Sequence, residues 1–137
     1  MDIVAAYVIA LVIFLALDAV WLGLAVPAFY RPRIGTLLRP APNWAAAGLF
    51  YALYAAGIVY FGVRSGMAPG QPQDALVDGA LYGFFTYLTY NATNLAVLRD
   101  YDAAVAVVDT IWGTLLGAAV SFATVLALGA LLPPVAG

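Results

Sequence analysis

The chain alternates between four long apolar stretches and short segments rich in proline, glycine and charged residues. A membrane span needs about 20 mostly apolar residues. The apolar stretches are long enough, and they cover residues 3–29, 44–63, 75–98 and 103–132. The pattern predicts an all-α membrane protein with a single domain over residues 1–137. We expect its four transmembrane helices to form an antiparallel bundle.

The connecting segments contain residues that stop or start helices. Three prolines follow the first span: Pro32, Pro40 and Pro42. Proline in a helix interior removes a backbone hydrogen bond, so we expect these residues to bar a continuous helix. Asn43 and Asp102 directly precede the second and fourth spans, where such side chains cap helices. Residues 99–103 form a short turn between the last two spans, which makes them antiparallel neighbours.

Arginine predicts the orientation of the spans. Four arginines lie in the first and third connecting segments: Arg31, Arg33, Arg39 and Arg99. The second segment has only Arg64. Because arginine accumulates on the cytoplasmic side, we expect a multi-pass protein of the bacterial inner (cytoplasmic) membrane with both termini in the periplasm. Four aromatic residues near span ends are expected in interfacial belts: Tyr30, Trp44, Tyr60 and Tyr101.

Composition narrows the chemistry. The chain is 66% hydrophobic and 9% charged, with a mean hydropathy of +1.00, whereas soluble domains have about 25% charged residues. It contains no His, Cys or Lys. These absences exclude the usual zinc, iron–sulfur and haem ligands, a Ser–His triad and a lysine Schiff base. We expect no metal and no cofactor. The net charge of −2 and the lack of a basic tract argue against nucleic acid as a partner.

Two aspartates interrupt the apolar spans, and each is followed three residues later by tryptophan. The pairs are Asp18 with Trp21 in the first span and Asp109 with Trp112 in the last. A carboxylate at the centre of a membrane helix costs roughly 2.5–3.5 kcal/mol on insertion scales, so it needs a partner or a purpose. The repeated pair is therefore the strongest indication of a site.

At 1.5 Å rise per residue, polar residues of the second and third spans lie at depths similar to those of the two aspartates. All of them fall in one layer, within the cytoplasmic half of the membrane. On the third span, Gly83, Tyr87, Asn91 and Asn94 share one helix face. We predict a polar binding pocket in this layer, centred on Asp18, Asn91, Asn94 and Asp109. The full set of predicted binding residues is Asp18, Trp21, Tyr51, Tyr54, Tyr87, Tyr90, Asn91, Asn94, Asp109 and Trp112.

Two interpretations of this layer remain open. In the structural one, both carboxyls are protonated and hydrogen-bond to asparagine or tyrosine, contributing about 0.6 kcal/mol per bond. In the functional one, a cavity opens toward the cytoplasmic leaflet and the carboxyls titrate as a coupled pair. Tryptophan walls and two carboxyls would suit a small amphipathic molecule, a lipid headgroup or a proton.

Small residues also recur at four-residue spacing in the last two spans. Gly79 and Gly83 form one such pair, and Gly113 and Gly117 form the other. Pairs of this kind allow membrane helices to approach closely. We expect them to pack the third span against the fourth, with dimerisation as the alternative.

Several segments together resemble a family of small bacterial four-span inner-membrane proteins, the domain-of-unknown-function family 2177. These segments are FLALDAVWLGL, FYRPRIGTLL, PNWAAAGLFYALYAAGIVYF, YGFFTYLTYNATNLA and VDTIWGTLLG. The resemblance implies the four-span fold and these candidate residues: Asp18, Trp21, Asn43, Trp44, Tyr90, Asn91, Thr93, Asn94, Asp109, Trp112 and Gly113. It supplies no activity. Some relatives are encoded near enzymes that modify membrane fatty acids, which favours a lipid ligand.

Three functions fit these observations. The first is binding of a lipid-like or small amphipathic molecule, with membrane lipids as partners. Its enzymatic version would use one aspartate as acid and the other as base, and no catalytic residue is assigned. The second is an accessory subunit of a larger complex, with other membrane protein subunits as partners. The third is a proton-coupled transporter, which four spans would require to act as a homodimer.

Overall fold

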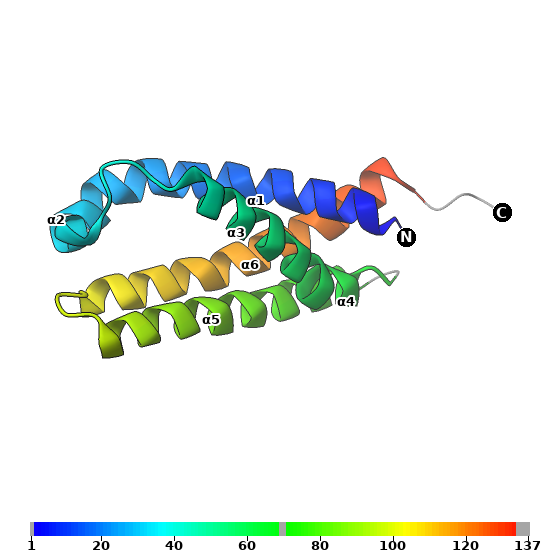
Figure 1. Ribbon diagram of the computed structural model, residues 1–137. Helices are drawn as coiled ribbons and strands as arrows, with labels where there is room; N and C mark the ends of the chain where they lie inside the picture. Colours follow the sequence, from blue (N-terminus) through cyan, green and yellow to red (C-terminus); the bar gives the residue numbers. More distant parts are fainter. Residues whose placement is uncertain (1, 69–70, 134–137) are drawn as a thin grey trace.

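The computed structural model describes residues 2–68 and 71–133, and every regular element within these ranges is helical. The elements form four long helical segments, which Figure 1 shows running back and forth along the molecule. The first comprises α1 (Ile3–Ala25), the π-helical η1 (Val26–Tyr30), α2 (Arg31–Ile34) and the 3-10 turn η2 (Gly35–Leu37). The second comprises α3 (Trp44–Gly57), the π-helical η3 (Ile58–Val63) and α4 (Arg64–Gly66). The third is α5 (Pro72–Val97), and the fourth is α6 (Ala103–Leu131).

Both expected helix caps are confirmed. The Asn43 side chain accepts a hydrogen bond of 3.1 Å from the Ala46 backbone N–H at the start of α3. The Asp102 side chain accepts one of 3.0 Å from the Val105 backbone N–H at the start of α6. These bonds satisfy backbone donors that have no partner inside the helix, which fixes where the two helices begin.

The expectation that Pro32 ends the first helix is wrong. The helical segment runs without a break from Ile3 to Leu37, and Pro32 lies in its interior. A π turn precedes the proline, and the Arg31 N–H donates to the carbonyl five residues back, at Val26. Pro32 lies at the start of α2, directly after this change from π-helical to α-helical hydrogen bonding. The helix ends before Pro40 and Pro42, as expected.

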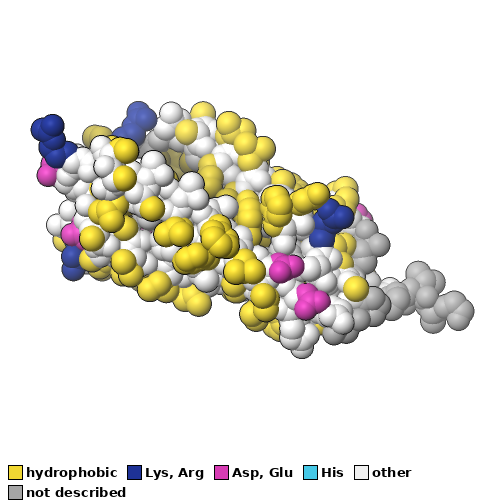
Figure 2. Space-filling model, turned by 90° about the horizontal axis from the view of Figure 1, so that it is seen from below, with side chains coloured by type: hydrophobic (Ala, Val, Ile, Leu, Met, Phe, Trp, Pro, Cys, Tyr) yellow, Lys and Arg dark blue, Asp and Glu magenta, His cyan; other side chains and the backbone are white. Residues whose placement is uncertain are grey.

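Three of the four segments are long and apolar enough to cross a membrane: Ile3–Leu37, Trp44–Gly66 and Ala103–Leu131. The 26-residue α5 is also long enough to cross a membrane, but it is less apolar than these three segments. The reason is its content of Asp, Asn, Thr and Tyr. Length and composition therefore establish three spans and not four. Figure 2 shows the charged side chains gathered toward the two ends of one face, with hydrophobic side chains between them.

Close backbone contact joins α5 to α6. A methyl group added at Gly83 would collide with the Gly113 carbonyl oxygen, and one added at Gly117 would collide with the Gly79 carbonyl oxygen. The two small-residue pairs therefore face each other within one chain. This confirms the expectation that they pack these two segments together.

We predict that Gly117→Ala destabilises the bundle and that Gly129→Ala, in the same helix, does not. The first substitution overpacks a backbone contact, at a cost of about 1–3 kcal/mol. The second meets nothing within 4 Å, so improved helix propensity is expected to stabilise α6 by up to about 1 kcal/mol. Equilibrium unfolding in mixed micelles measures both. Equal unfolding free energies for the two variants would contradict the close α5–α6 contact.

Candidate functional site

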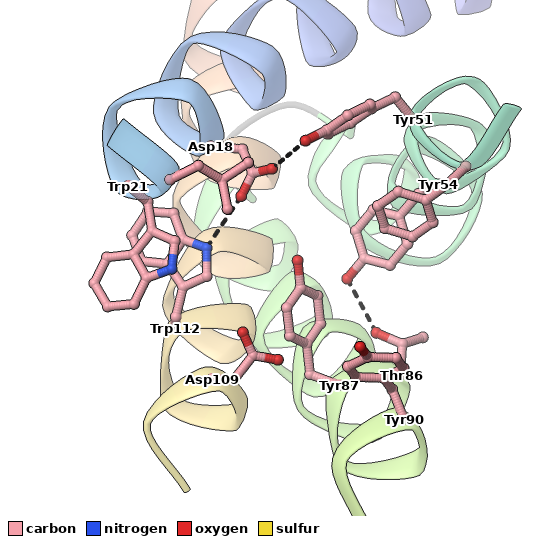
Figure 3. Close-up of a pocket in the computed structure, with 11 residues that line it drawn as sticks. Asp18, Trp21, Tyr51, Tyr54, Thr86, Tyr87, Tyr90, Asp109 and Trp112 are labelled. Carbon is pink, nitrogen blue, oxygen red and sulfur yellow. Dashed lines mark hydrogen bonds between the residues drawn. The ribbon is translucent and has the colours of Figure 1, made fainter. Parts of the chain in front are cut away.

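A cavity of about 440 Å³ lies among α1, α3, α5 and α6 (Figure 3). This volume falls within the range of about 300–1,000 Å³ that is typical of ligand pockets. The residues that line the cavity are Asp18, Trp21, Leu22, Phe50, Tyr51, Tyr54, Thr86, Tyr87, Tyr90, Asp109 and Trp112. All four long segments contribute, so the cavity exists only in the assembled bundle.

Asp18 is held by side chains from two other helices. The Tyr51 hydroxyl of α3 donates to its Oδ2 at 2.5 Å, and the Trp112 Nε1–H of α6 donates to its Oδ1 at 3.3 Å (Figure 3). The aspartate is 7% exposed. Each of its oxygens therefore has a neutral donor, which offsets part of the cost of removing the carboxyl from water.

Asp109 is held in the same way by a different pair. The Tyr30 hydroxyl of η1 donates to its Oδ1 at 2.7 Å, and the Asn91 amide of α5 donates to its Oδ2 at 2.7 Å. The asparagine is 1% exposed, and its Oδ1 accepts from the Tyr101 hydroxyl at 2.7 Å. Burial raises the pKa of the Tyr101 phenol, so this group keeps its proton at neutral pH and remains a donor.

The two Asp–Trp pairs are crossed. Trp112, from the second pair, bonds to Asp18 of the first, while the Trp21 N–H donates at 3.2 Å to Tyr30, which in turn bonds to Asp109. The two indole rings stack at a centroid distance of 4.5 Å and an angle of 5°. Residues three apart share a helix face, and α1 and α6 run in opposite directions (Figure 1). Each tryptophan can therefore reach the hydrogen-bond network of the other pair, which gives the repeated motif a physical reason.

The cavity reaches the surface of the bundle where three of its lining residues, one each from α1, α3 and α5, are exposed. The helix α3 packs mainly against α1, while α5 packs mainly against α6, η3 and α4. Tyr54 bridges the separation, with its hydroxyl 3.0 Å from the Thr86 hydroxyl (Figure 3). The rim residues Leu22, Phe50 and Tyr90 are exposed. The mouth therefore has a largely apolar edge, and the carboxyls lie deeper inside.

Tyr87 points its hydroxyl into the cavity (Figure 3). Its ring lies against Gly113, where any added side chain would collide with it. Among the described residues, its hydroxyl makes no hydrogen bond, in contrast to Tyr51 and Tyr54. The Tyr87 hydroxyl is therefore available to a molecule inside the cavity.

Eight of the ten predicted binding residues line the cavity: Asp18, Trp21, Tyr51, Tyr54, Tyr87, Tyr90, Asp109 and Trp112. Asn91 lies behind Asp109 and reaches the cavity only through its hydrogen bond to that carboxyl. Asn94 is not among the lining residues. The structure thus brings both aspartates and both tryptophans to one place, and it leaves Asn94 to one side.

The sequence did not indicate the roles of Tyr30 and Tyr101. Both were expected in interfacial belts, but Tyr30 is 8% exposed and both take part in the aspartate network. Trp44, by contrast, is 74% exposed, as a belt residue would be. Two lining residues carried a usable signal, because Phe50 and Thr86 lie four residues before Tyr54 and Tyr90, on the same helix faces.

We predict that the Trp21–Trp112 stack couples the stabilities of α1 and α6. In a double-mutant cycle with Trp→Leu substitutions, the coupling free energy should be about 0.5–1.5 kcal/mol, as found for aromatic pairs. The matched control pairs Trp21 with the exposed Trp44, whose effects should add. Unfolding free energies in mixed micelles measure both cycles. Additive effects for Trp21 and Trp112 would mean that the stack stabilises nothing.

Comparison with known proteins yields one match. Residues 3–126 match the model of a family described as "Predicted membrane protein (DUF2177)". No curated protein and no solved structure matches the chain. The matched region includes both Asp–Trp pairs and every residue that lines the cavity. Because the match covers most of the chain, the protein belongs to the DUF2177 family of membrane proteins.

Proposed function

We propose that this protein binds a lipid-like or small amphipathic molecule within the membrane, with the polar part of that molecule in the cavity between Asp18 and Asp109. The observation that carries the proposal is a cavity of about 440 Å³ that combines two carboxyls with a mostly aromatic wall and has exposed residues at its edge. The proposal assigns binding and no catalytic step.

The distribution of side chains around the cavity supports an amphipathic ligand. Its interior presents two carboxyls and the unpartnered Tyr87 hydroxyl, whereas its rim includes Leu22 and Phe50. A polar head would reach the carboxyls, and an apolar tail would leave between α3 and α5. We place this opening on the side of the bundle, where the tail would enter the hydrocarbon region of the bilayer directly.

The same proposal includes a membrane arrangement. We place α5 across the bilayer as the fourth span, because it packs closely along α6 and its polar residues Thr86 and Asn91 turn inward. The four arginines near α2 and the α5–α6 turn lie at one end of the molecule, and Arg64 lies at the other. The positive-inside rule then orients the first end toward the cytoplasm of a bacterial inner membrane, with both termini in the periplasm.

The other two hypotheses account for less of this geometry. An accessory subunit needs no cavity. A proton-coupled dimeric transporter needs a polar path to the opposite face, but large apolar side chains fill the core of the bundle, among them Phe14, Ile58 and Val63. The helices Ile3–Leu37 and Trp44–Gly66 stay continuous through their π-helical segments, whereas transporter sites typically use broken helices. Both hypotheses remain outcomes of the experiment below.

The proposal predicts that native mass spectrometry of gently extracted protein detects one bound small molecule per chain. Asp18→Asn and Asp109→Asn should each release it, because both carboxyls contact the cavity interior. The matched control is Asp74→Asn, which removes the same charge from the exposed first turn of α5 and should retain the molecule.

Two results would contradict the proposal. Stoichiometric copurifying protein chains without a small molecule would favour the accessory subunit. A small molecule that survives both cavity substitutions would show that it binds elsewhere.

A further inference from the structure

We propose that the molecule held in the cavity carries a positively charged ammonium head. This inference rests on the proposed function and adds the chemical class of the ligand. It follows from three features of the cavity: its uncompensated acidic groups, its aromatic walls and its shape.

The cavity contains acidic groups and no basic ones. Asp18 and Asp109 both line it, and none of the five arginines does. The chain has no lysine or histidine, and Arg33 makes its ion pair with Asp102, at 3.6 Å. The four groups that bond to the two carboxyls are neutral: two tyrosines, one tryptophan and one asparagine. When the two carboxyls ionise, no described side chain of the cavity supplies a paired positive charge, so the matching cation would come from a bound molecule.

Aromatic rings form most of the remaining wall. Seven of the eleven lining residues are aromatic: Trp21, Phe50, Tyr51, Tyr54, Tyr87, Tyr90 and Trp112. The faces of such rings are electron-rich, and they attract ammonium groups electrostatically. An anionic head would meet both carboxyls and the negative ring faces. Carboxyls and rings therefore select the same sign of ligand charge.

The shape favours an organic cation over a metal ion. Calcium takes six to eight oxygen ligands and magnesium an octahedral set. Within residues 2–68 and 71–133, no group of three or more His, Cys, Asp or Glu side chains comes together. A volume of about 440 Å³ is also far larger than a bare ion requires, and the exposed apolar residues Leu22 and Phe50 at the edge of the cavity suit an alkyl tail. An alkylammonium amphiphile satisfies all three features.

The test compares three ten-carbon amphiphiles that differ only in the head: decyltrimethylammonium, decanol and decyl sulfate. The protein carries Trp44→Phe, so its emission comes from Trp21 and Trp112 in the cavity wall, and it is held in micelles of an alkyl maltoside, whose uncharged head has no ammonium group. We expect decyltrimethylammonium to change this emission saturably, with at least tenfold higher affinity than decanol. Decyl sulfate should not compete with it.

A charge-removed variant separates cavity binding from general attraction to the surface. Asp18→Asn with Asp109→Asn should lower the affinity for decyltrimethylammonium at least tenfold and leave that for decanol nearly unchanged. Asp74→Asn should alter neither. The three amphiphiles are compared on protein that keeps both aspartates, so that comparison is valid even if the double variant fails to fold.

The outcomes distinguish the two claims. Equal saturable binding of decanol and decyltrimethylammonium would overturn the cationic head and leave amphiphile binding intact. Tighter binding of decyl sulfate would do the same. If none of the three amphiphiles binds saturably, the proposed function fails together with this inference.

Discussion

Two carboxyl groups in the apolar interior of a membrane protein need hydrogen-bond donors, because the hydrocarbon region offers no water to supply them. Here Asp18 of α1 takes its donors from α3 and α6, and Asp109 of α6 takes its donors from η1 and α5. The two side chains therefore tie all four long segments together. The two aspartates are costly to place in a membrane, and their hydrogen bonds fix how the segments are arranged.

Sequence patterns were sufficient where the structure depends on local rules. The caps at Asn43 and Asp102 and the glycine contacts between α5 and α6 follow from spacing and residue type. The same periodicity predicts one shared face for Tyr87 and Asn91, and this face of α5 turns inward. Thr86 and Asn91 form hydrogen bonds inside the bundle. The same two polar residues lower the hydropathy of α5.

Other features depend on tertiary contacts that spacing does not reveal. A π turn shifts the faces that residues present after Val26, which brings Tyr30 inward and carries the helix past Pro32. The chain after η2 also runs back toward the middle of the bundle before α3 begins (Figure 1). This path leaves α3 packed mainly against α1, and the hydroxyls of Tyr54 and Thr86 join α3 to α5 at the cavity.

The central claim is that the cavity around the stacked tryptophans is open to amphiphiles from the bilayer. Tryptophan emission from the Trp44→Phe protein in vesicles with bromine-labelled lipid chains tests it most directly, since only Trp21 and Trp112 then contribute. The account predicts strong quenching by brominated lipid, and relief of this quenching when a cavity ligand is added. Emission that brominated lipid leaves unchanged would show that the cavity is closed to the membrane, and the account would be wrong.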